Sequence, residues 1–264
     1  MRIGAVNYLN SRPLIEGLSS LLPTAEISLD YPSRLADQLA SARLDVALIP
    51  SVEYFRQSGY EVVSDACVAA RGEVMSVKLY CRVPPGKIRS LALDEGSRTS
   101  AALARVILAE KYGVFPTTEP LKLDATTRDS DADAVLLIGD RAMHTPDEAF
   151  DDVMDLGRKW YEWTGLPFVF AMWVARCDSS TDGVDEALAA ARDRGLANIE
   201  EIVRNDGVRI GLSEEVGRHY LTKNLHYRLS SAERTGLRLF QELAAQHNLV
   251  DPDVELVFRD LVTA

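Results

Sequence analysis

The sequence has few cysteines and lacks the common motifs that hold a metal or a nucleotide. Three cysteines occur in 264 residues, and no two of them form a CxxC pair. The four histidines form no HxxH or HExxH pattern, so we expect no zinc site. Neither GxGxxG nor GxxxxGK(S/T) is present, and no GxSxG sequence marks a serine nucleophile. We therefore expect a protein that works without a metal or another cofactor.

Positive charge and long apolar runs are also scarce. Lys and Arg total 29 against 40 Asp and Glu, which gives a formal net charge of −11 at pH 7. Such a field repels nucleic-acid phosphates and anionic lipid headgroups, so we expect neither nucleic acid nor a membrane as partner. No apolar run approaches the roughly 18 residues of a membrane span. An anionic ligand would have to be held by local donors against the overall field.

The cysteines and the first residues both bear on the compartment. Cys67, Cys81 and Cys177 are odd in number and widely spaced, which is typical of reduced core cysteines. Met1 leads directly into the strand-like sequence RIGAV, without an apolar core region or a small-residue cleavage site. We expect a cytoplasmic protein.

Short apolar runs alternate with amphipathic stretches along the first two thirds of the chain. Strands are expected at 3–7, 27–30 and 46–49, with helices between them, and this order predicts a parallel βαβαβ unit. The chain breaks at Pro84-Pro85-Gly86, and a second alternation follows up to about residue 174. Helical segments then dominate from about residue 185.

One arrangement accounts for this order. The sequence predicts an α/β fold of two lobes, with 1–80 plus 171–264 in the first and 81–170 in the second. Two crossovers between such lobes form a hinged cleft, which suits the capture of a small molecule.

Polar side chains recur where the predicted strands end, which is where open α/β sheets bind ligands. Asn10 and Ser11 follow the first strand, and Ser51 follows the third. Asn10 can both donate and accept a hydrogen bond, whereas Ser11 and Ser51 could also be ordinary helix caps. Ser76 lies in an apolar run, so its hydroxyl needs a partner from the backbone or from a ligand.

The segment Ser97-Arg98-Thr99-Ser100 begins a predicted helix with an unusual first turn. Helix starts normally attract Asp or Glu because of their partial positive charge. If Ser97 is the N-cap, the first turn holds Arg98, Thr99 and Ser100 instead, and an external anion could supply the missing negative charge. An ordinary capped helix with a solvated Arg98 is the alternative.

Asp140 follows the apolar run 135–138 and Gly139, which permits close approach of the backbone. A carboxyl group at a strand end in a cleft is a candidate general acid or base, although it could instead cap the next helix. The aromatic cluster 160–163 could line a pocket or belong to the core.

Six segments together resemble the chorismate dehydratases of the futalosine route to menaquinone. They are VNYLNSRPL (6–14), PSRLA (32–36), LDVALIPS (44–51), SRTS (97–100), LIGD (137–140) and WYEWTGLPF (160–168). The similarity covers about residues 1–175, and the helical tail only in general character. The resemblance implies a fold like that of type II periplasmic binding proteins. It also implies the conversion of chorismate to 3-(1-carboxyvinyloxy)benzoate by loss of water.

The resemblance also implies roles for individual residues. Asn10 would position the departing hydroxyl, and Ser76 would bind a ring hydroxyl or carboxylate. The residues Ser97, Arg98, Thr99 and Ser100 would bind a carboxylate, with Ser11, Ser51 and Gly139 completing the binding set. The base is either Asp140 or the enolpyruvyl carboxylate of the substrate. We favour the substrate, because an ionised Asp140 beside a dianion is costly.

Two other functions are compatible with such a fold. One is the dihydroxynaphthoate synthase of the same pathway, which we disfavour because the opening motif is of the dehydratase kind. No histidine is placed for the elimination chemistry of that enzyme either. The other is a solute-binding protein for small carboxylates, for which an export signal or a lipidation cysteine would speak. The sequence leaves the oligomeric state open.

Overall fold

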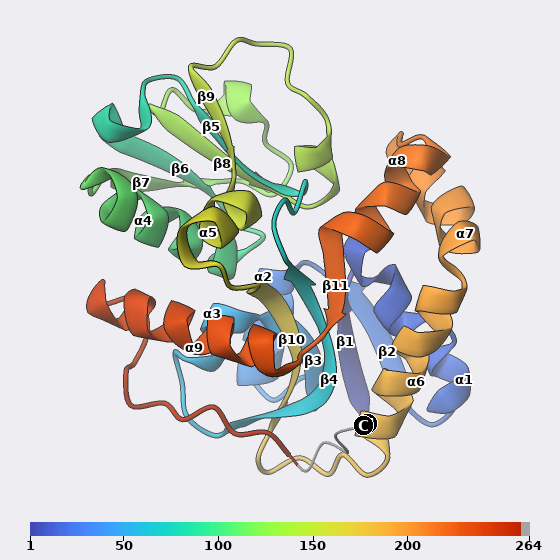
Figure 1. Ribbon diagram of the computed structural model, residues 1–264. Coiled ribbons are helices and arrows are strands. Elements are labelled where there is room, and N and C mark those ends of the chain that lie inside the picture. Colours follow the sequence, from blue (N-terminus) through green and yellow to red (C-terminus); the bar gives the residue numbers. More distant parts are fainter. Residues whose placement is uncertain (260–264) are drawn as a thin grey trace.

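The computed structural model describes residues 1–259 and contains two β-sheets (Figure 1). The first sheet consists, in spatial order, of β11 (Leu225–Arg228), β4 (Tyr60–Ala70), β10 (Phe168–Arg176), β3 (Val46–Pro50), β1 (Arg2–Val6) and β2 (Glu26–Asp30). The second consists of β7 (Thr117–Leu121), β6 (Ser90–Asp94), β8 (Ala134–Ile138), β5 (Val77–Cys81) and β9 (Asp152–Asp155). We call the parts built on these sheets lobe 1 (1–70 and 168–259) and lobe 2 (77–164).

Helices pack on both sheets. Lobe 1 carries α1 (Leu18–Leu21), α2 (Pro32–Ala40), α3 (Ser51–Tyr54), α6 (Val184–Ala197), α7 (Ile199–Ile202), α8 (Glu214–His219) and α9 (Ser231–Gln246). Lobe 2 carries α4 (Arg98–Tyr112) and α5 (Leu156–Thr164). The long helix α4 packs on β6 and β8 and also meets α3 and α9 of the other lobe, so it links the two.

The predicted βαβαβ unit is confirmed. Strand β1 pairs in parallel with both β2 and β3. Strands β4 and β11 are not among the predicted strands. Ser64 and Asp65 interrupt the apolar pattern of β4, and β11 is only 4 residues long within a helical tail. Both are antiparallel additions that extend the first sheet.

The chain crosses between the sheets at 71–76 and again at 165–167. Strand β5 pairs with β8 and β9 in the second sheet, while β10 pairs with β3 and β4 in the first. The expected divisions at 80/81 and 170/171 therefore lie within or at the end of these strands, because the apolar run 74–81 continues across the first crossover. At the second crossover, Trp160 is fully buried in edge-to-face contact with Phe168 and Phe240, so it belongs to the core.

A close approach of α6 holds the turn that carries Asn10. Residues Leu9–Ile15 form the 3-10 helix η1 directly after β1. A Cβ atom on Gly195 of α6 would lie 2.1 Å from the carbonyl oxygen of Pro13 and 2.4 Å from its Cα. Only a glycine lets α6 pack this closely on η1, so a helix of the tail packs directly on the turn that carries Asn10.

Gly195→Ala should therefore destabilise the protein. We expect overpacking to lower the free energy of unfolding by about 1–3 kcal/mol, which outweighs the better helix propensity of alanine. Urea unfolding measures the change. Gly86→Ala is the control, because a Cβ there meets nothing within 4 Å. Equal midpoints for the two variants would contradict the proposed tight contact.

Candidate functional site

A pocket lies between the two lobes and leaves a free volume of about 40 Å³. Interfaces between lobes or domains are a common location of small-molecule sites. Lobe 1 contributes Val6, Tyr8, Asn10, Pro32, Pro50, Val68, Phe170 and Ala171. The first crossover and lobe 2 contribute Val74, Ser76, Val77, Ser97, Ser100, Ile138 and Gly139. The carboxyl ends of β1, β3 and β8 meet here, which is the location that the sequence predicts.

The structure brings together five of the predicted site residues in the pocket wall. These are Asn10, Ser76, Ser97, Ser100 and Gly139. The other five lie beside the pocket or at the contact between the lobes, where they bond to protein atoms.

The N-terminus of α4 opens onto the pocket. Ser97 is the N-cap, as predicted, and its Oγ accepts the N–H of Ser100 at 3.3 Å. The two serine hydroxyl oxygens lie 3.0 Å apart. No acidic residue lies in the first turn of this 15-residue helix. The free first-turn N–H groups and the two hydroxyls together form a place where a carboxylate can bind.

A strained crossover presents Ser76. Met75 has φ +66°, a conformation that costs a non-glycine residue about 1–2 kcal/mol. The carboxylate of Asp155 holds this conformation by accepting the N–H groups of Val74 at 3.0 Å and Met75 at 2.6 Å. The Ser76 hydroxyl is buried, and its contact with the carbonyl oxygen of Val74 is long, at 3.5 Å. It is therefore available to a ligand.

Ser11, Ser51 and Thr99 bond to the protein itself. Ser11 Oγ donates to the carbonyl groups of Val6 and Tyr8, within its own turn. Ser51 Oγ donates to the carbonyl oxygen of Val169 at 2.7 Å. All three hydroxyls are buried, and their bonds to the protein hold together the elements around the pocket.

Thr99 links the lobes at this point. Its Oγ1 accepts the N–H of Val52 in α3 at 3.1 Å and lies 3.4 Å from the hydroxyl oxygen of Ser51. A side chain of α4 therefore completes the start of a lobe 1 helix.

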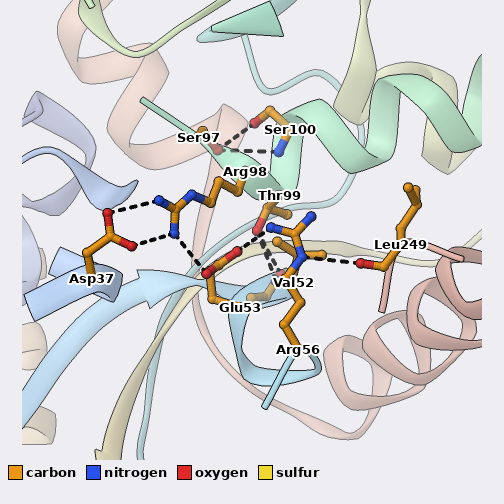
Figure 2. Close-up of polar contacts among 10 residues, drawn as sticks. Asp37, Val52, Glu53, Arg56, Ser97, Arg98, Thr99, Ser100 and Leu249 are labelled. Carbon is orange, nitrogen blue, oxygen red and sulfur yellow. Dashed lines mark hydrogen bonds and ion pairs between the residues drawn. The ribbon is translucent and has the colours of Figure 1, made fainter. Parts of the chain in front are cut away.

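Arg98 also faces lobe 1 instead of the pocket. Figure 2 shows its guanidinium reaching both carboxylate oxygens of Asp37, at 2.8 and 2.9 Å, and one oxygen of Glu53 at 3.0 Å. The Glu53 side chain is 7% exposed, so this carboxylate depends on its cationic partners Arg98 and Arg56. The anions that Arg98 meets here belong to the protein, and these ion pairs link the two lobes.

Asp140 makes another contact between the lobes. Its carboxylate accepts the N–H of Leu9 at 3.1 and 3.4 Å. Burial raises the pKa of Asp140 to about 6, although the Leu9 hydrogen bond and the charge of Arg12 act in the opposite direction. The residue begins the short 3-10 helix η4 (Asp140–Met143) and is not part of the pocket wall.

Tyr8 forms a wall of the pocket that sequence reasoning missed. A Cβ on Gly139, which has φ +70°, would lie 2.7 Å from the Tyr8 ring, and a Cβ on Gly96 would lie 3.1 Å from its hydroxyl oxygen. The two glycines thus leave a slot for the ring. Burial raises the pKa of Tyr8, so its hydroxyl remains a donor. The position of Tyr8, between the first predicted strand and Asn10, could have indicated that it lies in the site.

The pocket wall is mostly apolar, with a few polar side chains, and it is uncharged. Within residues 1–259, none of the side chains that line it is that of Asp, Glu, Lys, Arg or His. The same residues contain no group of three or more His, Cys, Asp or Glu that could hold a metal ion. None of their helices has the length and apolar character needed to cross a membrane. An anionic ligand would therefore meet hydroxyl, amide and backbone N–H donors.

Comparison with known proteins assigns the family. The family described as menaquinone biosynthesis matches residues 1–246. The chain belongs to this family. A chorismate dehydratase of Thermus thermophilus is 31% identical and covers 91% of this chain and 93% of its own length. A chorismate dehydratase of Campylobacter jejuni is 28% identical and covers 94% of this chain and 100% of its own length. The resemblance predicted from the six segments is thus confirmed.

Solved structures agree on the fold. A protein of Archaeoglobus fulgidus superposes with a TM-score of 0.75 at 15% identity, covering 94% of this chain and 98% of its own. The periplasmic aliphatic sulphonate-binding protein of Escherichia coli has a TM-score of 0.62 at 16% identity, and the match covers 100% of this chain and 94% of that protein. The predicted periplasmic-binding-protein-like fold is confirmed.

Replacing Arg98 should loosen the contact between the lobes. In Arg98→Met, Glu53 still pairs with Arg56. We therefore expect the free energy of unfolding to fall by less than the typical cost of breaking a buried ion pair, which is about 3–5 kcal/mol. The radius of gyration from small-angle X-ray scattering should rise as the lobes separate. Arg128→Met removes an exposed pair within lobe 2 and serves as control. An unchanged radius in Arg98→Met would show that the pair does not hold the lobes together.

Asp140→Asn should change the pH dependence of stability. The pKa of Asp140 is about 6 in the folded protein against an ordinary 3.8. Between these values the folded protein binds more protons than the unfolded chain, so its free energy of unfolding falls as the pH rises. Asparagine stays neutral and can still accept the Leu9 N–H. The variant should match the wild type near pH 4 and exceed it above pH 6.

Urea unfolding across this pH range measures the difference between Asp140→Asn and the wild type. Asp131→Asn, at an exposed position, is the control and should follow the wild type throughout. A difference between Asp140→Asn and the wild type that stays constant with pH would contradict the prediction.

Proposed function

We propose that this chain is a chorismate dehydratase, a carbon–oxygen lyase that removes water from chorismate to give 3-(1-carboxyvinyloxy)benzoate. The observation that carries the proposal is the nearly full-length match to two proteins with this name, at 31% and 28% identity. The pocket supports it, because Asn10 and Ser76 line it together with the N-terminus of α4. Chorismate is a dicarboxylate, and these groups are donors.

We further propose that the reaction serves the futalosine route to menaquinone, in the cytoplasm and without a metal. Membership of the menaquinone biosynthesis family supports the pathway. Cys67, Cys81 and Cys177 are all free thiols, as a reducing compartment favours. Cys67 and Cys81 are buried as predicted, whereas Cys177 is exposed because it follows the end of β10.

The proposed reaction breaks two bonds to ring carbons of chorismate, the C3–H bond and the C4–O bond of the hydroxyl. A base takes the proton from C3, the C3–H electron pair forms a C3–C4 double bond, and the C4 hydroxyl leaves. The proton and the hydroxide together make the water, and the ring becomes aromatic. The protein has to orient the ring and donate a hydrogen bond to the departing oxygen. We assign Asn10 to that oxygen and Ser76 to a ring hydroxyl or carboxylate, with Ser97 and Ser100 at a carboxylate.

The environment of the pocket favours the enolpyruvyl carboxylate of the substrate as the base. Within residues 1–259, no carboxylate or imidazole side chain lines the pocket. The carboxylate of Asp140 lies outside this wall and accepts the Leu9 N–H. A base supplied by the substrate also avoids burying a further negative charge beside a dianion.

Purified protein incubated with chorismate in buffer containing a chelator should form a product lighter by one water, followed by liquid chromatography with mass detection. Asn10→Ala and Ser76→Ala should each lower kcat by about 100-fold or more, the typical loss when an oriented donor is removed. Asp140→Asn should keep turnover within about tenfold of the wild type, because Asp140 only supports the pocket.

Each alternative has its own outcome. Unchanged chorismate with a ligand-induced rise in Tm would indicate a solute-binding protein. Full turnover by folded Asn10→Ala and Ser76→Ala would remove these residues from the mechanism. Loss of turnover in Asp140→Asn without weaker binding would make Asp140 the base.

A further inference from the structure

Tyr220 brings a third polar group to the Asn10 and Ser76 pair from a distant part of the chain. Its ring is fully buried, and its hydroxyl lies beside the side chains of Ser76 and Asn10, whose hydrogen-bonding contacts lower its pKa. Burial has the larger effect and raises the pKa of Tyr220, so the phenol keeps its proton and can donate it. Yet the hydroxyl makes no hydrogen bond of ordinary geometry with any atom of residues 1–259.

The Tyr220 and Ser76 hydroxyls therefore lack good protein partners. Apart from its Tyr220 neighbour, Ser76 Oγ has within residues 1–259 only the long contact to the Val74 carbonyl oxygen, at 3.5 Å. The Asn10 side chain lines the pocket. A buried hydroxyl without a partner is costly to folding, and phenylalanine would fill the same space without that cost. The cluster is thus incomplete until a further polar group, such as a ligand, joins it.

Tyr220 lies in an irregular turn of the backbone. It begins the π-helical turn η7 (Tyr220–Asn224) between α8 and β11, a distortion that is frequent at functional sites. At the other end of this turn, Asn224 Nδ2 donates to the carbonyl oxygen of Glu73 at 3.0 Å, in the crossover that leads to Ser76. The same short turn thus holds the crossover and carries the phenol.

We propose that Tyr220 is a positioning residue of the dehydratase site, whose hydroxyl donates to Ser76 Oγ once substrate is bound and so directs the Ser76 proton toward the substrate. This inference rests on the proposed function. Donation from Tyr220 leaves the Ser76 hydroxyl with only the ligand as acceptor for its own proton, and it polarises that O–H bond. Tyr220 acts through Ser76 and does not line the pocket itself.

Tyr227 offers a matched control. It is also a buried tyrosine whose hydroxyl has no partner within residues 1–259, and its charged form would interact with Tyr220 and Cys67 instead of the pocket residues. Tyr220→Phe and Tyr227→Phe each remove one unpartnered hydroxyl, so we expect neither to lower Tm. A difference in kcat between the two variants is then due to where the hydroxyl lies, because both hydroxyls are buried.

The test measures kcat and KM for chorismate in both variants and in the wild type. Tyr220→Phe should lower kcat about tenfold, the rate equivalent of one hydrogen bond, with KM within about threefold. Tyr227→Phe should keep kcat within about twofold. In a Ser76→Ala background, Tyr220→Phe should lower kcat no further, because its route through Ser76 is already gone.

Two results would overturn the assignment. One is a wild-type kcat in Tyr220→Phe; the other is a full additional loss in the Ser76→Ala background, which would mean that Tyr220 does not act through Ser76. Both leave the dehydratase function intact, since the wild type still turns over chorismate. A wild type that does not dehydrate chorismate would instead refute the proposed function and this role of Tyr220 with it.

Discussion

The first turn of α4 lies where the two lobes meet, and the pocket depends on this contact. Successive residues of a helix point about 100° apart, so one turn faces in several directions. Ser97 and Ser100 face the pocket, while Arg98 pairs with Asp37 and Glu53 of lobe 1. Because the buried Glu53 carboxylate would lose a cationic partner if the lobes separated, this contact favours the arrangement in which Ser97 and Ser100 line the pocket.

This use of Arg98 also bears on how the pocket treats an anion. The chain has a net charge of −11, and its lining side chains within residues 1–259 are uncharged. A guanidinium against the enolpyruvyl carboxylate would bind it well but would also stabilise its ionised form and make it a weaker base. Neutral donors and a helix N-terminus hold a carboxylate with less loss of basicity. An uncharged wall therefore suits a reaction in which the ligand supplies its own base.

The parts of the site that follow from local sequence could be predicted. Asn10, Ser76 and Gly139 lie at or near the ends of strands, and the N-cap role of Ser97 depends only on the residues after it. The role of Arg98 could not be predicted, because its partners lie 45 and 61 residues away on helices of the other lobe. The hydroxyl of Ser11 was expected to serve a ligand, but its own turn satisfies it.

The helical tail shows why local patterns leave part of the site unseen. Asn10 and Ser76 lie on short segments between regular elements, and such segments need packing from elsewhere to hold one conformation. Gly195 of α6 lets that helix contact η1 beside Asn10, and Asn224 anchors the crossover before Ser76. Neither residue carries a chemical signature in the sequence, because glycine acts here through the space that it leaves and asparagine through one bond to a backbone carbonyl. Since both contacts join the tail to segments some 150 residues or more earlier, only the folded chain reveals that this tail supports the segments that carry Asn10 and Ser76.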